Sequence, residues 1–224
     1  MKRLHVLLIA LLPAMAFAQE APVSQPVKFG LQAGATYAGI RGNPGAEDND
    51  YAVDYLIGAS IEVPINERLS FIGNLNYERK SFSNKIVTSN GVNDPFDPIV
   101  QTGEFDVRAT LHYLSVPLNL KYYIGPSRKF YINGGVFAGF FLDNTLRVDG
   151  DKTEDESGNG IFKEFDFGLN LGLGMRVPID EKNDLNIELR DNLGLVNISD
   201  VPVIDNGTVK TNSVNLIVSW QFGL

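Results

Sequence analysis

Histidine is the first residue type to weigh for chemistry in this sequence, because it is so scarce. After His5, at the start of the chain, the only histidine is His112, and the acid nearest to it in sequence is Asp106. A histidine beside a carboxylate can serve an enzyme as a general acid or base. A lone histidine near a strand end is more typical of an interfacial or loop position. We therefore expect no catalytic residue, no cofactor and no enzyme activity, and keep a membrane enzyme as an alternative.

The segment Asp149–Gly160, DGDKTEDESGNG, is a second candidate because it is rich in carboxylates. Hard cations such as Ca²⁺ prefer several carboxylate oxygens. The acids that could supply them are Asp149, Asp151, Glu154, Asp155 and Glu156. The spacing is not that of an EF-hand loop, because Thr153 occupies a ligand position and Glu154 replaces the required glycine. We expect a solvated acidic loop and no metal site, with divalent cations or envelope proteins as conceivable partners there.

A third set of ionisable residues recurs on the polar side of alternating segments. Its members are Lys28, Asp54, Glu62, Glu78, Lys80, Lys121, Asp166, Arg176, Glu188 and Arg190. Such a set could line a proton or ion path, or it could fill a narrow lumen with paired charges. An eight-stranded barrel has just enough interior for side chains, which favours the filled lumen. We expect Arg176 to form a buried ion pair with Glu188 or another inward acid, since unpaired buried charges are costly.

The element that would position these charges is clearest in Phe165–Ile179, FDFGLNLGLGMRVPI. Apolar side chains occupy every odd position, a period of two that predicts a β-strand with one apolar and one polar face. At about 3.3 Å per residue the segment reaches about 45–50 Å, enough to cross a hydrocarbon core while tilted. Its polar face is rich in glycine and carries the opposite charges Asp166 and Arg176, which suits a narrow lumen better than a solvated outer surface.

The same alternation recurs in other segments along the chain. The eight predicted strands are Val27–Ile40, Val53–Ile65, Leu69–Phe82, Leu111–Ile124, Lys129–Asp143, Phe165–Ile179, Asp184–Ser199 and Thr211–Phe222. The long loops predicted between them are Arg41–Tyr51, Ser83–Thr110, Asn144–Glu164 and Asp200–Lys210, and short turns fill the other connections. This pattern predicts an all-β fold, an eight-stranded antiparallel up-and-down transmembrane β-barrel with four long extracellular loops and short periplasmic turns. The first strand should pair with the last, because an unpaired edge is not tolerated in lipid.

The first residues of the chain predict export. Residues 1–18 begin with Lys2 and Arg3, continue as an apolar run and end in Ala16-Phe17-Ala18, the pattern of a cleaved signal peptide. Residues 19–26 form a periplasmic lead-in, and residues 27–224 form the barrel. The sequence has no cysteine, so neither a lipid-modified cysteine nor a disulfide is expected. We therefore expect the barrel itself to anchor the protein in the cell outer membrane.

Several strand segments carry a resemblance to a known family. The segments that carry it lie within residues 113–199 and resemble the PorT-like outer-membrane β-barrel family of Bacteroidetes. They are YLSVPLNLKYYIG, INGGVFAGFFL, DFGLNLGLGMRV and ELRDNLGLVNIS. These motifs are structural and carry no catalytic signature. The resemblance implies a small outer-membrane barrel, and some members of that family are linked to type IX secretion. The sequence departs from the family at Asp191, where an aromatic residue usually follows the arginine.

Asp191 also conflicts with the predicted register of its strand. Strict alternation from Leu185 and Ile187 places its carboxylate on the lipid face near the middle of the membrane, where a charge is costly. A β-bulge within Arg190–Asn192 would turn Asp191 inward. The alternative is that the strand sits further out and leaves Asp191 at the membrane interface.

The expected function is that of a surface-exposed structural or interaction protein of the outer membrane, with a lumen filled by side chains. An accessory role in protein export, implied by the resemblance, is an alternative. The expected partner is outer-membrane lipid, and we expect a monomer. Nucleic acid is not an expected partner, because the formal net charge is −8.

Overall fold

The computed structural model describes residues 26–90, 101–152, 160–203 and 206–223. The predicted signal peptide, most of the lead-in and the tip of the second loop lie outside these residues. The strands are β1 (Lys28–Arg41), β2 (Asp50–Pro64), β3 (Leu69–Asn90), β4 (Gln101–Ile124), β5 (Phe130–Val148), β6 (Asp151–Lys152), β7 (Phe165–Pro178), β8 (Asn183–Gly194) and β9 (Lys210–Gly223). The described residues also contain the short helix α2 (Pro44–Glu47), and they include no helix long and apolar enough to span a membrane.

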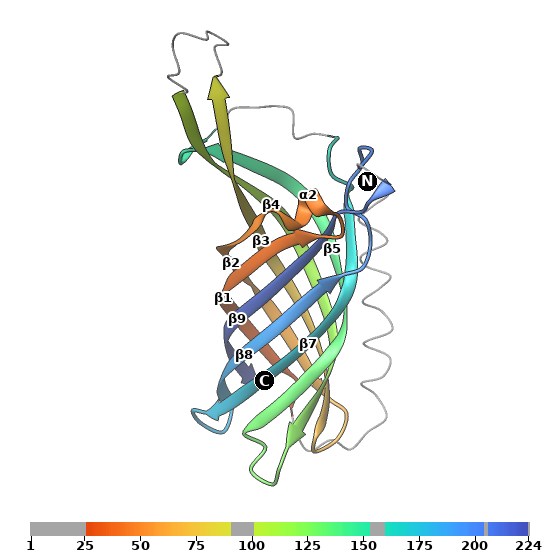
Figure 1. The fold of residues 1–224 in the computed structure, drawn as a ribbon. Helices are drawn as coiled ribbons and strands as arrows, with labels where there is room; N and C mark the ends of the chain where they lie inside the picture. The colour runs from red at the N-terminus through yellow and green to blue at the C-terminus, as the bar shows by residue number, and fades with distance from the viewer. Residues whose placement is uncertain (1–25, 91–100, 153–159, 204–205, 224) are drawn as a thin grey trace, which may run out of the picture.

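The long strands close into a barrel, as predicted (Figure 1). Their order is β4-β3-β2-β1-β9-β8-β7-β5, and β4 pairs with β5 to complete the ring, while the two-residue β6 pairs with β5 alone. All pairings are antiparallel. The first strand meets the last along its whole length, from Lys28 opposite Gly223 to Arg41 opposite Lys210. The expected eight-stranded up-and-down barrel is confirmed.

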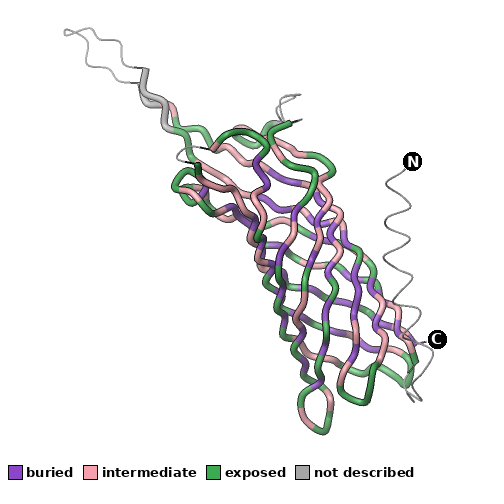
Figure 2. The backbone as a smooth tube through the Cα atoms, turned by 90° about the vertical axis from the view of Figure 1, so that its right-hand side faces the viewer, coloured by how far each residue is buried: buried purple, intermediate pink, exposed green. Residues whose placement is uncertain are grey.

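Burial alternates along each strand in the sense expected for lipid rather than water (Figure 2). On β7, Leu171 is 68% exposed and Leu173 61%, whereas the intervening polar face holds Asp166 at 0% and Asn170 at 4%. A protein in water normally buries its leucines and exposes its carboxylates. The outer belt of this barrel therefore needs an apolar solvent, and its interior is polar.

The β3–β4 hairpin differs from the prediction, because strand structure continues where a loop was expected over Ser83–Thr110. Pairing runs without interruption to Asn90 opposite Gln101, well beyond β2, whose first residue Asp50 pairs with Ser83. In Figure 1 the two strands rise above the rest of the barrel. This extension has polar side chains on both faces and no lipid to face, so its composition resembles that of a loop.

β8 ends at Gly194 rather than at the predicted Ser199, and the chain then folds over the barrel mouth. Ile198 is fully buried in a cluster with Leu111 and Tyr113, and Phe162 packs against that cluster. The backbone N–H of Leu195 bonds the carbonyl of Phe167 on the neighbouring strand. Ile198 and Val196 therefore pack in the interior at the loop end, whereas Leu195 stays 42% exposed.

The predicted bulge at Asp191 is absent. Arg190, Asp191 and Asn192 pair in regular register with Gly172, Leu171 and Asn170, so Asp191 points outward. Because β8 ends at Gly194, Asp191 lies three residues from the loop end of its strand. The Arg41 guanidinium bonds the Gly194 carbonyl at 2.6 Å and interacts electrostatically with Asp191. The second expectation, an interfacial Asp191, is the one that the structure supports.

Candidate functional site: the charged lumen

The lumen begins, at the end where the short turns lie, with a shared carboxylate. Asp184 bonds the Lys28 ammonium through one oxygen and the Arg176 Nε through the other, at 2.8 Å for the arginine. Asp184 is almost fully buried, and the Arg176 side chain is 20% exposed. Two cations beside one carboxylate offset the cost of withdrawing the Asp184 charge from water.

A second ion pair joins β4 to β2 over the inner face of β3. Lys121 Nζ lies 2.9 Å from Glu62 Oε2, and the Tyr123 hydroxyl donates to Glu62 Oε1 at 2.7 Å. The Lys121 ammonium also lies 4.0 Å from the centroid of the Tyr131 ring, a cation–π distance. Both charged groups are buried, so pairing and the aromatic faces replace the water they have lost.

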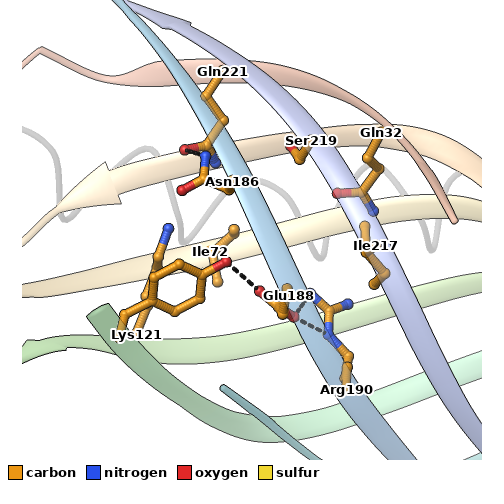
Figure 3. Close-up of a pocket in the computed structure, with 10 residues that line it drawn as sticks. Gln32, Ile72, Lys121, Asn186, Glu188, Arg190, Ile217, Ser219 and Gln221 are labelled. Carbon is orange, nitrogen blue, oxygen red and sulfur yellow. Dashed lines mark hydrogen bonds and ion pairs between the residues drawn. The ribbon is translucent and has the colours of Figure 1, made fainter. Parts of the chain in front are cut away.

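A third cluster lies beside the second one (Figure 3). The Arg190 Nε donates to Glu188 Oε1 at 2.6 Å, and the Tyr131 hydroxyl donates to Glu188 Oε2 at 3.0 Å. Asn186 donates to Gln221 at 2.9 Å on the same side of the lumen. The cavity that these side chains line measures about 10 Å³, room for about one water molecule. Side chains therefore fill this part of the lumen.

Two further carboxylates lie toward the loop end. Asp166 accepts a bond from Thr211 at 2.6 Å and pairs with Lys80 at 3.1 Å, and the Lys80 ammonium lies 4.8 Å from the Phe137 ring centroid. Glu78 is held by neutral donors, and those bonds come from Ser213 at 3.0 Å, Asn215 at 3.3 Å and Asn192 at 3.4 Å. Above these groups, at the loop end, Ile198 packs with Leu111 and Tyr113 in a buried apolar cluster.

Alternation predicted the inward charges well, with one exception. Every residue of the predicted set lies on the lumen side except Asp54, which lies in a bulge of β2 between Ala52 and Leu56. Its carboxylate bonds Arg79 and Arg108, whose side chains lie on the outward face of β3 and β4. The inward position predicted for Asp54 is therefore wrong, because the extra residue of the bulge shifts the side chain out of the alternating pattern.

The ion pair expected for Arg176 is formed with an inward acid other than Glu188. Arg176 bonds Asp184, another inward acid, and Glu188 bonds Arg190 instead. Asp184 lies at the start of β8, where the predicted strand also begins and the alternation has no preceding residue to support it. Extending the alternation of Asn186 and Glu188 backward by two residues would have found it.

The histidine–acid pair that an enzyme would need is not formed between His112 and Asp106. The Tyr77 hydroxyl lies 2.5 Å from His112 Nδ1, and Thr145 Oγ1 lies 3.0 Å from Nε2. Asp106 is opposite Lys85 on the hairpin, and the acid opposite His112 is Asp143. His112 therefore packs between two hydroxyl groups on the outward face of the barrel rim.

The acidic loop falls mainly outside the described residues, as do its Glu154, Asp155 and Glu156. Asp149 Oδ1 accepts from the backbone N–H of Asp106 at 2.9 Å. Among the described residues no three histidine or acidic side chains are grouped as a metal site would require.

The geometry defines the class of protein as a small transmembrane barrel whose lumen carries paired charges. A family model described as an outer membrane protein beta-barrel domain matches residues 17–200, and the chain belongs to this family of outer-membrane proteins. No curated protein matches the chain. In barrels of this class the short turns face the periplasm and the long loops face the exterior.

Among solved structures, several small outer-membrane barrels are similar to the chain. Neisserial surface protein A is 15% identical, with 88% of this chain and 97% of that chain covered and a TM-score of 0.47. Ail of Yersinia pestis, solved with the heparin analogue sucrose octasulfate, is 12% identical, with 88% and 100% covered and a TM-score of 0.44. The Escherichia coli outer membrane protein W is 16% identical, with 90% and 100% covered and a TM-score of 0.41.

Proposed function

We propose that this barrel is a non-catalytic anchor that presents a surface-exposed structural or interaction element outside the outer membrane. The observation that carries the proposal is the closed lumen. Paired charges occupy its length, and the Ile198 cluster packs at its loop end. A barrel closed in this way has little room for a solute, which leaves its outer surface and loops as the parts available for function.

The β3–β4 hairpin is the element we propose for contact. Ile86 is 47% exposed and Phe105 is 40% exposed, and the two lie opposite each other in register above the barrel. Beyond Ser83 the outer edge of β3 has no partner in β2, so its backbone donors and acceptors are open to an added strand. Exposed apolar side chains beside an open strand edge suit recognition of another envelope protein.

Site-specific photo-cross-linking in native outer membranes tests this role. A photoreactive residue in place of Ile86 should yield protein adducts that depend on the hairpin. The same residue in place of Leu171, which is 68% exposed on the lipid face, is the matched control and should yield lipid adducts only. Absence of protein adducts at Ile86, with the barrel folded and abundant, would contradict the interaction role.

The remaining expectations form part of the same proposal. We propose that the chain is exported by a leader cleaved after Ala18, and that it functions as a monomer, because its sheet closes on itself without help from a second copy. An accessory role in export rests on the PorT-like resemblance of the strand motifs. No contact of the described residues favours that role or an enzyme over the anchor.

A further inference from the structure

Glu78 differs from the other carboxylates of the lumen, because no cation pairs with it. It is 1% exposed, and its Oε1 accepts hydrogen bonds from Ser213 at 3.0 Å, from Asn215 at 3.3 Å and from Asn192 at 3.4 Å. All three donors are neutral. Among the described residues, no basic side chain forms an ion pair with Glu78. A buried carboxylate without a countercharge is costly, so the charge pairing of the lumen is incomplete at this point.

The cations near Glu78 are already paired with other acids. Lys80, two residues further along β3, lies 3.1 Å from Asp166. Arg190 on β8 bonds Glu188 at 2.6 Å. Glu78 and Asp166 therefore share one ammonium group, that of Lys80, and the loop end of the lumen carries one negative charge in excess.

The excess positive charge of the lumen lies at the turn end, too far away to balance Glu78. There Lys28 and Arg176 share the single carboxylate of Asp184. Asp184 and Asn192, which bonds Glu78, lie near opposite ends of β8 and about 25 Å apart. The Arg176 side chain is also partly exposed, so water screens its charge. The excess at the loop end therefore needs a partner of its own.

Four oxygen atoms near Glu78 and Asp166 have no hydrogen-bond partner among the described residues. They are the Tyr113 hydroxyl oxygen and the Oδ1 atoms of Asp166, Asn192 and Asn215, in side chains at most 2% exposed. The amide orientations follow from Glu78, because a carboxylate accepts from Nδ2 and repels Oδ1. The atoms left over are therefore acceptors, which an additional positive charge would satisfy.

These oxygens belong to side chains that converge on one part of the lumen. Tyr113 is opposite Glu78 in the register of β3 and β4. A Cβ placed on Gly139 would lie 3.2 Å from the Tyr113 ring and 3.3 Å from the Cβ of Asp166, so both side chains lie over the same glycine. We call the set the oxygen cluster, and it consists of Glu78, Tyr113, Asp166, Asn192 and Asn215.

We propose that the oxygen cluster binds a monovalent cation such as Na⁺. Hard cations prefer carboxylate and carbonyl oxygens, and the cluster supplies both. One positive charge balances the excess carboxylate. A divalent ion fits less well, because Ca²⁺ takes about six to eight oxygen ligands and Lys80 already compensates Asp166. The bound cation would join side chains of β3, β4, β7, β8 and β9 across the lumen and so stabilise the closed barrel.

Urea unfolding in phosphatidylcholine vesicles, followed by the fluorescence of Trp220, tests the proposal. The full barrel is refolded in NaCl or in tetramethylammonium chloride at the same ionic strength, which keeps the screening of surface charges equal. The methyl groups of tetramethylammonium keep oxygens away from its charge. The wild type should have its midpoint at higher urea in NaCl. Above the dissociation constant, each tenfold rise in Na⁺ should raise the folding equilibrium constant about tenfold.

Three variants assign the effect to the oxygen cluster. Glu78→Gln keeps the size of the side chain and removes its charge, so its midpoint should be the same in both salts. Asn215→Ala removes one carbonyl oxygen and should shift the Na⁺ dependence to higher concentration. Glu104→Gln removes an exposed carboxylate on the hairpin and is the matched control, which should keep the wild-type dependence.

Two results would overturn the proposal. Equal midpoints of the wild type in the two salts would exclude a bound cation, and that measurement does not depend on any variant folding. An unchanged Na⁺ dependence in Glu78→Gln would place the cation elsewhere and overturn the assignment to the oxygen cluster.

Discussion

The lumen and the β3–β4 hairpin both contain ion pairs, yet the two regions differ in how far those pairs are withdrawn from water. Inside, Lys121 bonds Glu62, Lys80 bonds Asp166, and Asp184 serves two cations. Outside, Lys85 pairs with Glu104 at 3.1 Å, and both side chains stay more than half exposed. The lumen charges have exchanged water for protein partners, whereas the hairpin charges remain solvated. Charge in the first region therefore holds the barrel together, and charge in the second contributes little to its stability.

The largest expected effect tests whether lumen charge is structural. Lys121→Met leaves Glu62 as a buried carboxylate without its cation, which should cost about 3–5 kcal/mol of unfolding free energy. Urea unfolding in lipid vesicles, followed by the fluorescence of Trp220, the only tryptophan, measures the change.

The matched control lies outside the barrel. Lys85 pairs with Glu104 at 3.1 Å, but both side chains are more than half exposed, so Lys85→Met should leave unfolding unchanged. The double variant E62L/K121M should recover much of the loss, because it removes the stranded charge as well. Equal effects of Lys121→Met and Lys85→Met would remove the distinction between the two regions.

Arg176→Met should have a smaller effect in the same direction. Asp184 keeps Lys28 when the arginine is lost, so the carboxylate stays compensated, and we expect a loss of about 1–2 kcal/mol. The same urea titration measures it. A loss as large as that of Lys121→Met would mean that the Lys28 contact does not compensate Asp184.

Asp191→Leu should act in the opposite direction, because its carboxylate faces outward beside Leu171 and Val214. Replacing an outward acid near the interface by leucine should stabilise the barrel by up to about 1 kcal/mol. Asp191→Asn, which keeps the size and removes the charge, is the control. Clear destabilisation by leucine would point to a structural role for the contact with Arg41.

The smallest effect concerns pH at the β7–β8 turn. Hydrogen bonds from the backbone N–H of Lys182, the Asn183 side chain and the Asn183 N–H lower the pKa of Asp180. A lowered folded pKa means that the stabilisation is present above the ordinary pKa and is lost as pH falls through the folded value. Amide exchange at this turn should rise at acidic pH in the wild type. Asp180→Asn should exchange faster at neutral pH and show less change on acidification.

Much of this molecule could be predicted from the sequence, because lipid and lumen impose opposite polarity on successive residues. That rule placed Glu62, Lys121 and Glu188 in the lumen before any contact was known. It could not assign their partners, because alternation gives the face of a residue and not its neighbour across the barrel. For this reason the sequence predicts an inward acid as the partner of Arg176 but cannot choose between Glu188 and Asp184.

The fold departs from the prediction where residues do not face lipid on one side and the lumen on the other, so that polarity does not alternate. The bulge at Asp54 lies in YAVDYL, where every residue except Asp54 is apolar, so the letters carry no alternation whose interruption could mark it. The β3–β4 extension stands above the lipid, so nothing forces its outward face to be apolar. Ile198 sustains the alternation past the true end of β8, but its side chain packs in the apolar cluster at the loop end.

Single-channel recording of the full barrel in a planar bilayer tests most directly whether the lumen is filled and closed. The packing of Lys121, Arg190 and the Ile198 cluster predicts that folded, inserted protein gives no stable conductance steps. Insertion would be verified separately by resistance to proteolysis of the strands. Discrete, long-lived steps from wild-type protein would contradict a closed lumen, and with it the conclusion that the lumen charges serve only to hold the barrel together.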